Sequence, residues 1–143
     1  MSNWIKQIVG IAVLGLNRNR ILEKVHADPQ SAWPVVERVW RAARGVYRSP
    51  IGASARVPFE LLLLEEMLKK PAECEDVLAQ HISHSNAYVS AYCLLGLERL
   101  GSHKIKDLPE SLTSRQETVR ICIACLSMPQ SLGSFAKQLS AVN

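Results

Sequence analysis

The sequence has no apolar run long enough to cross a membrane as a helix. Residues 8–16 form an apolar stretch of nine residues, whereas a spanning helix needs about 20. Arg18 and Arg20 follow this stretch, but a signal peptide carries its positive charge ahead of the apolar run and a small-residue cleavage site behind it. We therefore expect a first helix packed on the core and no membrane span.

A complete set of metal-binding residues is also missing. The chain has four cysteines, Cys74, Cys93, Cys122 and Cys125. Cys122 and Cys125 have the spacing of a zinc knuckle, and His81 and His84 could add two imidazole ligands, but there is no second cysteine pair. Because all four cysteines fall within predicted helices, we interpret them as reduced, buried thiols of a cytoplasmic protein with no metal or cofactor.

The residue patterns typical of catalysis are absent as well. The common signatures are a nucleophile beside a base, paired carboxylates or a glycine-rich phosphate loop. Glu65 and Glu66 are adjacent and so point in different directions on a helix, with Lys69 and Lys70 placed to balance them. Gly52 and Gly101 stand alone. We expect no enzyme.

What is present is enough apolar sequence for one folded domain covering residues 1–143. Hydrophobic residues make up 48% of the chain and charged residues 21%, a composition that builds a core without disulfides. The net charge of +4 is uneven, because residues 1–56 hold nine Lys/Arg against three acids and the remainder holds eight against ten. Such asymmetry bears on partners and not on fold.

The hydrophobic periodicity predicts an all-α fold of about six to seven antiparallel helices. Its centre is the stretch from Asn86, a good helix N-cap, to Gly101, placed where a helix ends with a left-handed residue. No stretch alternates with period two for long enough to predict a strand. The expected helices cover residues 3–25, 31–48, 57–70, 71–83, 86–101, 114–127 and 129–142, with a short helical piece at 104–112.

An internal repeat links the predicted central helix to its neighbours. Residues 85–97 can be laid over residues 115–126 with Val89 on Val119, an offset of 30 residues. A third copy begins at Val57, 32 residues before Val89. The spacing is that expected for stacked helical units.

This pattern resembles the HEAT-like repeat family, in which a Val-Arg-like pair opens the inner helix of each unit. Val119-Arg120 matches that opening, and Val89-Ser90 matches half of it. The resemblance covers residues 55–143 and implies a short curved α-solenoid, or an irregular helical bundle, whose concave surface binds a macromolecule. Residues 1–48 would then form an N-terminal helical cap.

A set of arginines is the most informative feature for function. Arg38, Arg41, Arg44 and Arg48 recur at spacings of three, three and four residues, so on a continuous second helix they would line one face. Arg56 extends the set. The face could bind an acidic protein or nucleic acid, or it could simply be solvated and cover apolar neighbours.

The sequence therefore favours a non-catalytic, cytoplasmic protein-binding module. The expected partner is a protein with an acidic patch, possible roles being an immunity protein that occludes a toxin, another inhibitor, or an adaptor. The predicted binding residues are Arg38, Arg41, Arg44, Arg48 and Arg56. The alternative is a nucleic-acid-binding helical repeat, similar in outline to the HEAT-like DNA glycosylases, that uses the same arginines against phosphates.

Overall fold

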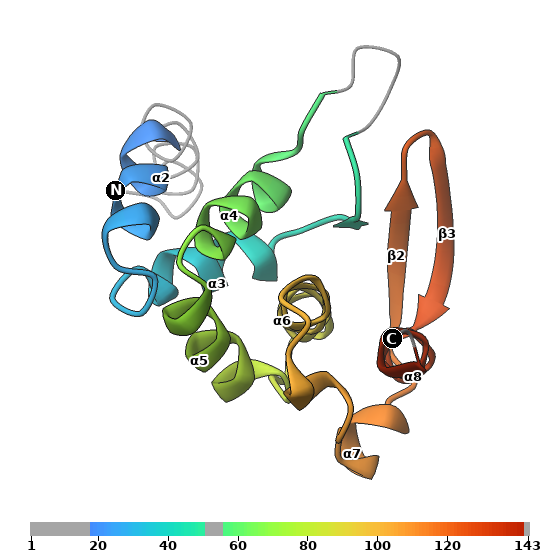
Figure 1. The fold of residues 1–143 in the computed structure, drawn as a ribbon. Coiled ribbons are helices and arrows are strands. Elements are labelled where there is room, and N and C mark those ends of the chain that lie inside the picture. The colour runs from blue at the N-terminus through green and yellow to red at the C-terminus, as the bar shows by residue number, and fades with distance from the viewer. Residues whose placement is uncertain (1–17, 51–55, 142–143) are drawn as a thin grey trace, which may run out of the picture.

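The structure is a computed structural model that describes residues 18–50 and 56–141. The apolar stretch at residues 8–16, predicted to lie in the first helix, falls outside the described residues. The elements, in chain order, are α2 (Arg18–Ala27), α3 (Trp33–Arg41), β1 (Val46–Tyr47), α4 (Phe59–Leu68), α5 (Pro71–His81), α6 (Ala87–Arg99), the 3₁₀-helix η1 (His103–Ile105), α7 (Glu110–Thr113), β2 (Thr118–Ile123), β3 (Leu126–Ser131) and α8 (Leu132–Ala141) (Figure 1).

The expected all-α class is wrong, because a three-stranded sheet accompanies the helices. The strand order is β1-β2-β3. Strand β1 pairs in parallel with β2, placing Val46 opposite Ile121, and β2 pairs antiparallel with β3, placing Ile121 opposite Met128. The molecule is therefore mostly helical with a mixed sheet at one side (Figure 1).

The helix predicted at residues 114–127 is a strand for most of its length. The first four residues of β2 alternate exposed and buried, the period of a strand with one face on a core. Just before β2, Glu117 forms an ion pair with Arg115. Pro129 lies within β3, so the last helix begins at Leu132 and not at Pro129.

Helix α6 forms the centre of the molecule, as predicted. The Asn86 side chain accepts hydrogen bonds from the backbone N–H groups of Tyr88 and Val89, at 3.0 and 3.2 Å. At the other end Gly101 has φ +66° and closes the helix in the left-handed conformation. Residues 89–97 are all buried, because α3, α4, α5, α8 and the sheet pack around them.

The aromatic core joins the helices to α6. Trp33 and Trp40 of α3 are both buried, with ring centroids 5.9 Å apart. The Trp40 ring stacks on Tyr92 of α6 at 5.1 Å. The Trp40 Nε1–H donates to the backbone carbonyl of Glu60 at 3.1 Å, so the buried indole has its hydrogen-bond partner.

Two tyrosines of α6 bind the backbone of the sheet. The Tyr92 hydroxyl accepts from the Tyr47 N–H at 3.1 Å and donates to the Gly45 carbonyl at 2.8 Å. The Tyr88 hydroxyl accepts from the Arg120 N–H at 3.1 Å, beside the start of the short strand β1. Side chains of the central helix thus supply hydrogen bonds where the sheet has no neighbouring strand.

The second helix ends at Arg41, seven residues earlier than expected. The chain then turns so that β1 can pair with β2, a contact between segments about 75 residues apart that no local pattern reports. At Gly45 a Cβ atom would lie 2.9 Å from Cys122 Sγ, so a larger residue there would require the Cys122 side chain to shift. No helix of the described residues is long and apolar enough to cross a bilayer.

Candidate functional site

The arginines predicted to bind a partner do not share one helix face. Arg38 and Arg41 are exposed on α3, where Arg41 forms an ion pair with Glu37 at 3.0 Å. Arg44 and Arg48 lie beyond the end of that helix, on either side of β1. The continuous basic stripe is therefore a wrong prediction, because the helix stops before its last two members.

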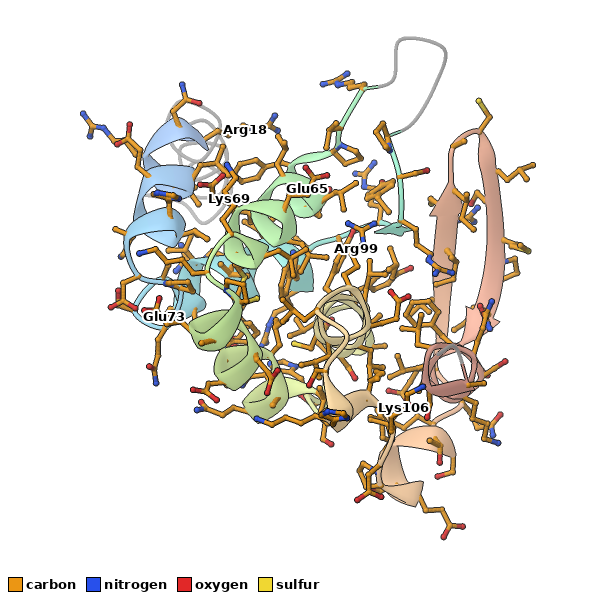
Figure 2. The ribbon with its side chains drawn as sticks, in the orientation of Figure 1. Arg18, Glu65, Lys69, Glu73, Arg99 and Lys106 are labelled. Carbon is orange, nitrogen blue, oxygen red and sulfur yellow. The ribbon has the colours of Figure 1, made fainter. Side chains whose placement is uncertain are left out.

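Arg56 lies elsewhere, in a pocket that it shares with Arg18. The pocket has a volume of about 220 Å³, and Val57, Pro58, Phe59 and Glu60 complete its lining. The guanidinium carbon of Arg18 lies 5.0 Å from the centroid of the Phe59 ring, a cation–π distance. Figure 2 places Arg18 at the start of α2. The carboxylate of Glu60 in the same lining opposes the two positive charges.

The two histidines considered as metal ligands have partners within the protein. The imidazole of His81 stacks on Trp33 with centroids 4.0 Å apart, and burial lowers its pKa. His84 Nδ1 accepts from the Asn86 N–H at 2.9 Å, and its Nε2 lies 3.6 Å from a Glu37 carboxylate oxygen. Among residues 18–50 and 56–141, no three His, Cys, Asp or Glu residues are placed to hold a metal ion.

The cysteines divide into a buried group and one exposed residue. Cys74 and Cys93 lie on α5 and α6, and burial raises the pKa of Cys74 to about 12 and that of Cys93 well above its ordinary value. Cys122 is buried in β2, but Cys125 is exposed in the turn between β2 and β3. The prediction that all four lie in helices is wrong for this second pair, since the segment carrying them is a hairpin.

The hairpin carries an exposed apolar surface. The exposed large hydrophobic residues in the described part of the chain are Ile123, Leu126 and Met128, with exposed fractions of 40%, 70% and 55%. We call these three residues the hairpin patch. Large apolar side chains that cluster on a surface mark sites of interaction.

The hairpin patch continues the core-facing side of the sheet. Ile123 is opposite Leu126, and Met128 is opposite the buried Ile121. Since opposed residues share a face and alternate residues along a strand return to it, the patch lies on the same face as Ile121 and Val119. The hairpin extends past α6 and α8, which cover only its base (Figure 1). Ile123, Leu126 and Met128 at its tip are therefore exposed.

The outer edge of β3 is protected against pairing with a further strand. The Arg120 N–H and the Cys122 carbonyl both form hydrogen bonds on the side of β2 away from β3. In an antiparallel pair, the residues opposite them, Pro129 and Ser127, therefore direct their backbone groups to the free edge. Proline has no N–H to offer there, so the hairpin presents side chains and not a complete strand edge.

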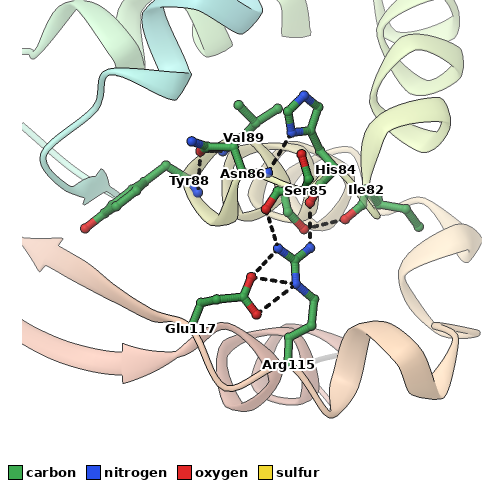
Figure 3. A network of polar contacts seen from close by, with 9 residues as sticks. Ile82, His84, Ser85, Asn86, Tyr88, Val89, Arg115 and Glu117 are labelled. Carbon is green, nitrogen blue, oxygen red and sulfur yellow. Dashed lines mark hydrogen bonds and ion pairs between the residues drawn. The ribbon is translucent and has the colours of Figure 1, made fainter.

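A polar network fixes the base of the hairpin against α6. Arg115 donates to the backbone carbonyls of His84 and Ser85, at 2.6 and 2.9 Å, and pairs with Glu117 (Figure 3). The hydrogen bond from Arg115 lowers the pKa of the Glu117 carboxyl. At the tip, the Ala124 N–H donates to the Ser49 hydroxyl at 2.7 Å. The hairpin is thus held at both ends.

No family model, curated protein or solved structure matches this chain. The candidate site is the hairpin patch. The sequence does not predict this patch, because the helices expected at residues 114–127 and 129–142 contain or adjoin Ile123, Leu126 and Met128. The alternation of polar and apolar residues from Thr118 to Ile121 was the available signal.

Proposed function

We propose that this chain is a non-catalytic module that binds another protein through the hairpin patch. The observation that carries the proposal is that the exposed large hydrophobic residues of the described chain all gather on one face of one hairpin. Methionine and other large apolar side chains are typical of the buried centre of an interface. A role as inhibitor, immunity protein or adaptor requires only such binding.

The support beneath the patch favours recognition of a defined partner. The turn is tied to Ser49 at the tip, Arg115 holds the base, and Tyr88 binds the middle of β2. A surface that is already ordered loses little conformational freedom when it binds. The hairpin is therefore a suitable binding element despite having only two strands.

The proposal is tested by affinity capture from a lysate of the native host, with and without nuclease. The test variant is Leu126→Ser/Met128→Ser, which replaces the two most exposed residues of the patch. The matched control is Glu65→Ser/Glu73→Ser, at two exposed positions on α4 and α5 (Figure 2). Circular dichroism of all three proteins shows whether they share one fold.

We expect the wild-type and control proteins to retain the same stoichiometric protein after nuclease treatment. The hairpin variant should retain about 10-fold less, since removal of exposed anchors from an interface typically costs 1–2 kcal/mol or more. Equal retention by the hairpin variant would contradict the proposal. Loss of all captured material on nuclease treatment would favour the nucleic-acid alternative instead.

A further inference from the structure

We infer that the hairpin patch recognises an apolar segment flanked by carboxylates, which pair with Arg48 and Arg99. This inference rests on the proposed function and adds the chemistry of the partner. It combines the apolar patch with two guanidinium groups that the fold brings beside it. Neither arginine forms an ion pair with a carboxylate of the described residues.

Arg48 is placed next to the patch by the register of the sheet. Tyr47 is opposite Cys122 in the parallel pair, and the Arg48 N–H donates to the Cys122 carbonyl at 2.9 Å. Arg48 therefore comes level with Ile123, on the same face of the sheet. Its guanidinium carbon lies 6.0 Å from the centroid of the Phe135 ring of α8, which keeps the side chain on that face.

Arg99 comes to the same place from the end of α6. Its Nη2 donates to the backbone carbonyl of Arg48, and Figure 2 shows its side chain near the segment that follows β1. Arg99 is exposed and Arg48 is half-buried. Two guanidinium groups on neighbouring segments, one of them partly shielded from water, form a site where a carboxylate is attracted more strongly than on an open surface.

The segments that form the sheet, its turn and α8 contain positive charge and no acid. Residues 42–50 contain Arg44 and Arg48 but no acid, and residues 118–141 contain Arg120 and Lys137 but no acid. These two segments provide all three strands, the turn and α8. An acidic partner therefore meets no repulsion from these two segments, whereas a basic partner does.

The blocked edge of β3 narrows the mode of binding. Because Pro129 interrupts the row of outward N–H groups, a partner gains little from adding a strand. Recognition must therefore come from side chains. Large apolar groups of the partner would pack on Leu126 and Met128, and a carboxylate of the partner would pair with Arg48 and Arg99. An anionic membrane would offer similar chemistry, so the experiment includes vesicles as a separate arm.

The test uses a phage-displayed library of random 16-residue peptides as the probe. The library is selected on the full-length wild-type protein at low salt, with the soluble Leu126→Ser/Met128→Ser variant as competitor to remove peptides that bind elsewhere. Dissociation constants of the enriched peptides are then measured by fluorescence anisotropy. The variants are Arg99→Glu and Arg48→Gln, and Arg38→Glu on α3 is the matched control for charge reversal.

We expect the enriched peptides to carry Asp or Glu beside a large apolar residue. Arg99→Glu should weaken their binding about 10-fold or more, and Arg38→Glu less than twofold. Replacement of the peptide acid by Lys should restore binding to Arg99→Glu. Arg48→Gln removes the guanidinium charge but keeps much of the aliphatic part of the side chain, and it should also weaken binding. This second variant tests the arginine pair even if Arg99→Glu disturbs the fold.

Three results would overturn the inference. Enriched hairpin-dependent peptides without acids would refute the carboxylate while leaving the proposed protein-binding function intact. Equal effects of Arg99→Glu and Arg38→Glu would refute the arginine pair. Hairpin-dependent flotation with phosphatidylserine-containing vesicles, without enrichment of any hairpin-dependent peptide, would assign the surface to a membrane.

Discussion

Helix α6 and the β2–β3 hairpin are both rich in apolar residues, yet their surroundings are opposite. Residues 89–97 of α6 are buried on every side by other helices and the sheet. The hairpin is covered on one face and only near its base, so Ile123, Leu126 and Met128 remain exposed. Apolar sequence therefore contributes to folding in the first region and is available for binding in the second.

The two regions also differ in how their backbone is satisfied. Helix α6 is closed at both ends by its own local groups, the Asn86 side chain and the left-handed Gly101. The sheet depends on distant residues, since the hydroxyls of Tyr88 and Tyr92 bind its backbone. The hairpin is thus positioned by the helical core, whereas α6 is specified by its own sequence.

The largest expected contrast between the two regions is in thiol reactivity. Cys125 in the hairpin turn is exposed, while the thiol of Cys93 in α6 is fully buried and its pKa is raised by burial. With a thiol reagent at neutral pH, Cys125 should react at once. Cys93 should react at least about 1000-fold more slowly, because the protein must unfold extensively before the reagent can reach its thiol. Mass spectrometry over time measures both rates, and fast labelling of Cys93 would contradict the buried position of α6.

A pair of alanine substitutions tests the same contrast through stability. Leu95 in α6 is 1% exposed, and Leu126 in the hairpin is 70% exposed. Leu95→Ala should lower the free energy of unfolding by about 2–5 kcal/mol. Leu126→Ala should change it by less than about 0.5 kcal/mol. Urea denaturation measures both, and a cost above about 2 kcal/mol for Leu126→Ala would mean that the hairpin tip is packed against something in solution.

A smaller effect is expected at the turn of the hairpin. Ala124 has φ 52°, which costs an L-residue with a Cβ roughly 1–2 kcal/mol. Glycine removes that strain but gives the unfolded chain more freedom, worth about 0.4–1 kcal/mol. Ala124→Gly should therefore stabilise the protein by about 0.5 kcal/mol. A lower midpoint of thermal unfolding in Ala124→Gly would indicate that Ala124 adopts its positive φ without strain.

The smallest expected effect is the contribution of His81, on α5, to the pH dependence of the free energy of unfolding. Burial lowers the pKa of His81 below 6.5, as does the charge of His84, while Glu37 raises it. Above pH 6.5 the imidazole is neutral in both folded and unfolded states. As the pH falls below 6.5, the unfolded state takes up a proton more readily, so stability decreases.

The matched variant for this effect is His81→Phe, which can still stack on Trp33 but does not titrate. Urea denaturation at pH 7.5 and 5.5 should show a smaller loss of stability at the lower pH in the variant. Equal losses would assign the acid sensitivity to other groups. Both pH values lie above the range of Glu66 and Glu117, whose carboxyl pKa values are already lowered, so these acids stay ionised throughout.

Local patterns predicted the helical part of the fold well, because caps and breaks act within a few residues. Asn86 and Gly101 bound the central helix as expected, and Pro71 begins α5. The sheet was missed for a different reason. The alternation from Thr118 to Ile121 covers only four residues, and the apolar run that follows, Ile121 to Ile123, fits a buried helix or a strand equally well. The pairing that decides between them involves Val46, far away in the chain.

The same limit applies to the candidate site. The sequence predicts Arg48 as a binding residue, but the reason for that prediction is wrong. It assumed that Arg48 lies on the second helix, which ends at Arg41. Its proximity to Ile123 arises from the parallel register of β1 and β2. Arg99 was not singled out, because its place beside Arg48 depends on the hydrogen bond from the end of α6 to a distant backbone carbonyl.

Pro129 has a consequence for the behaviour of this protein at high concentration. A bare strand edge can serve as a template on which identical chains assemble one after another. With Pro129 at an outward-facing position of β3, the template is interrupted within a six-residue strand. The chain can therefore expose the apolar hairpin patch while its backbone resists growth into fibres.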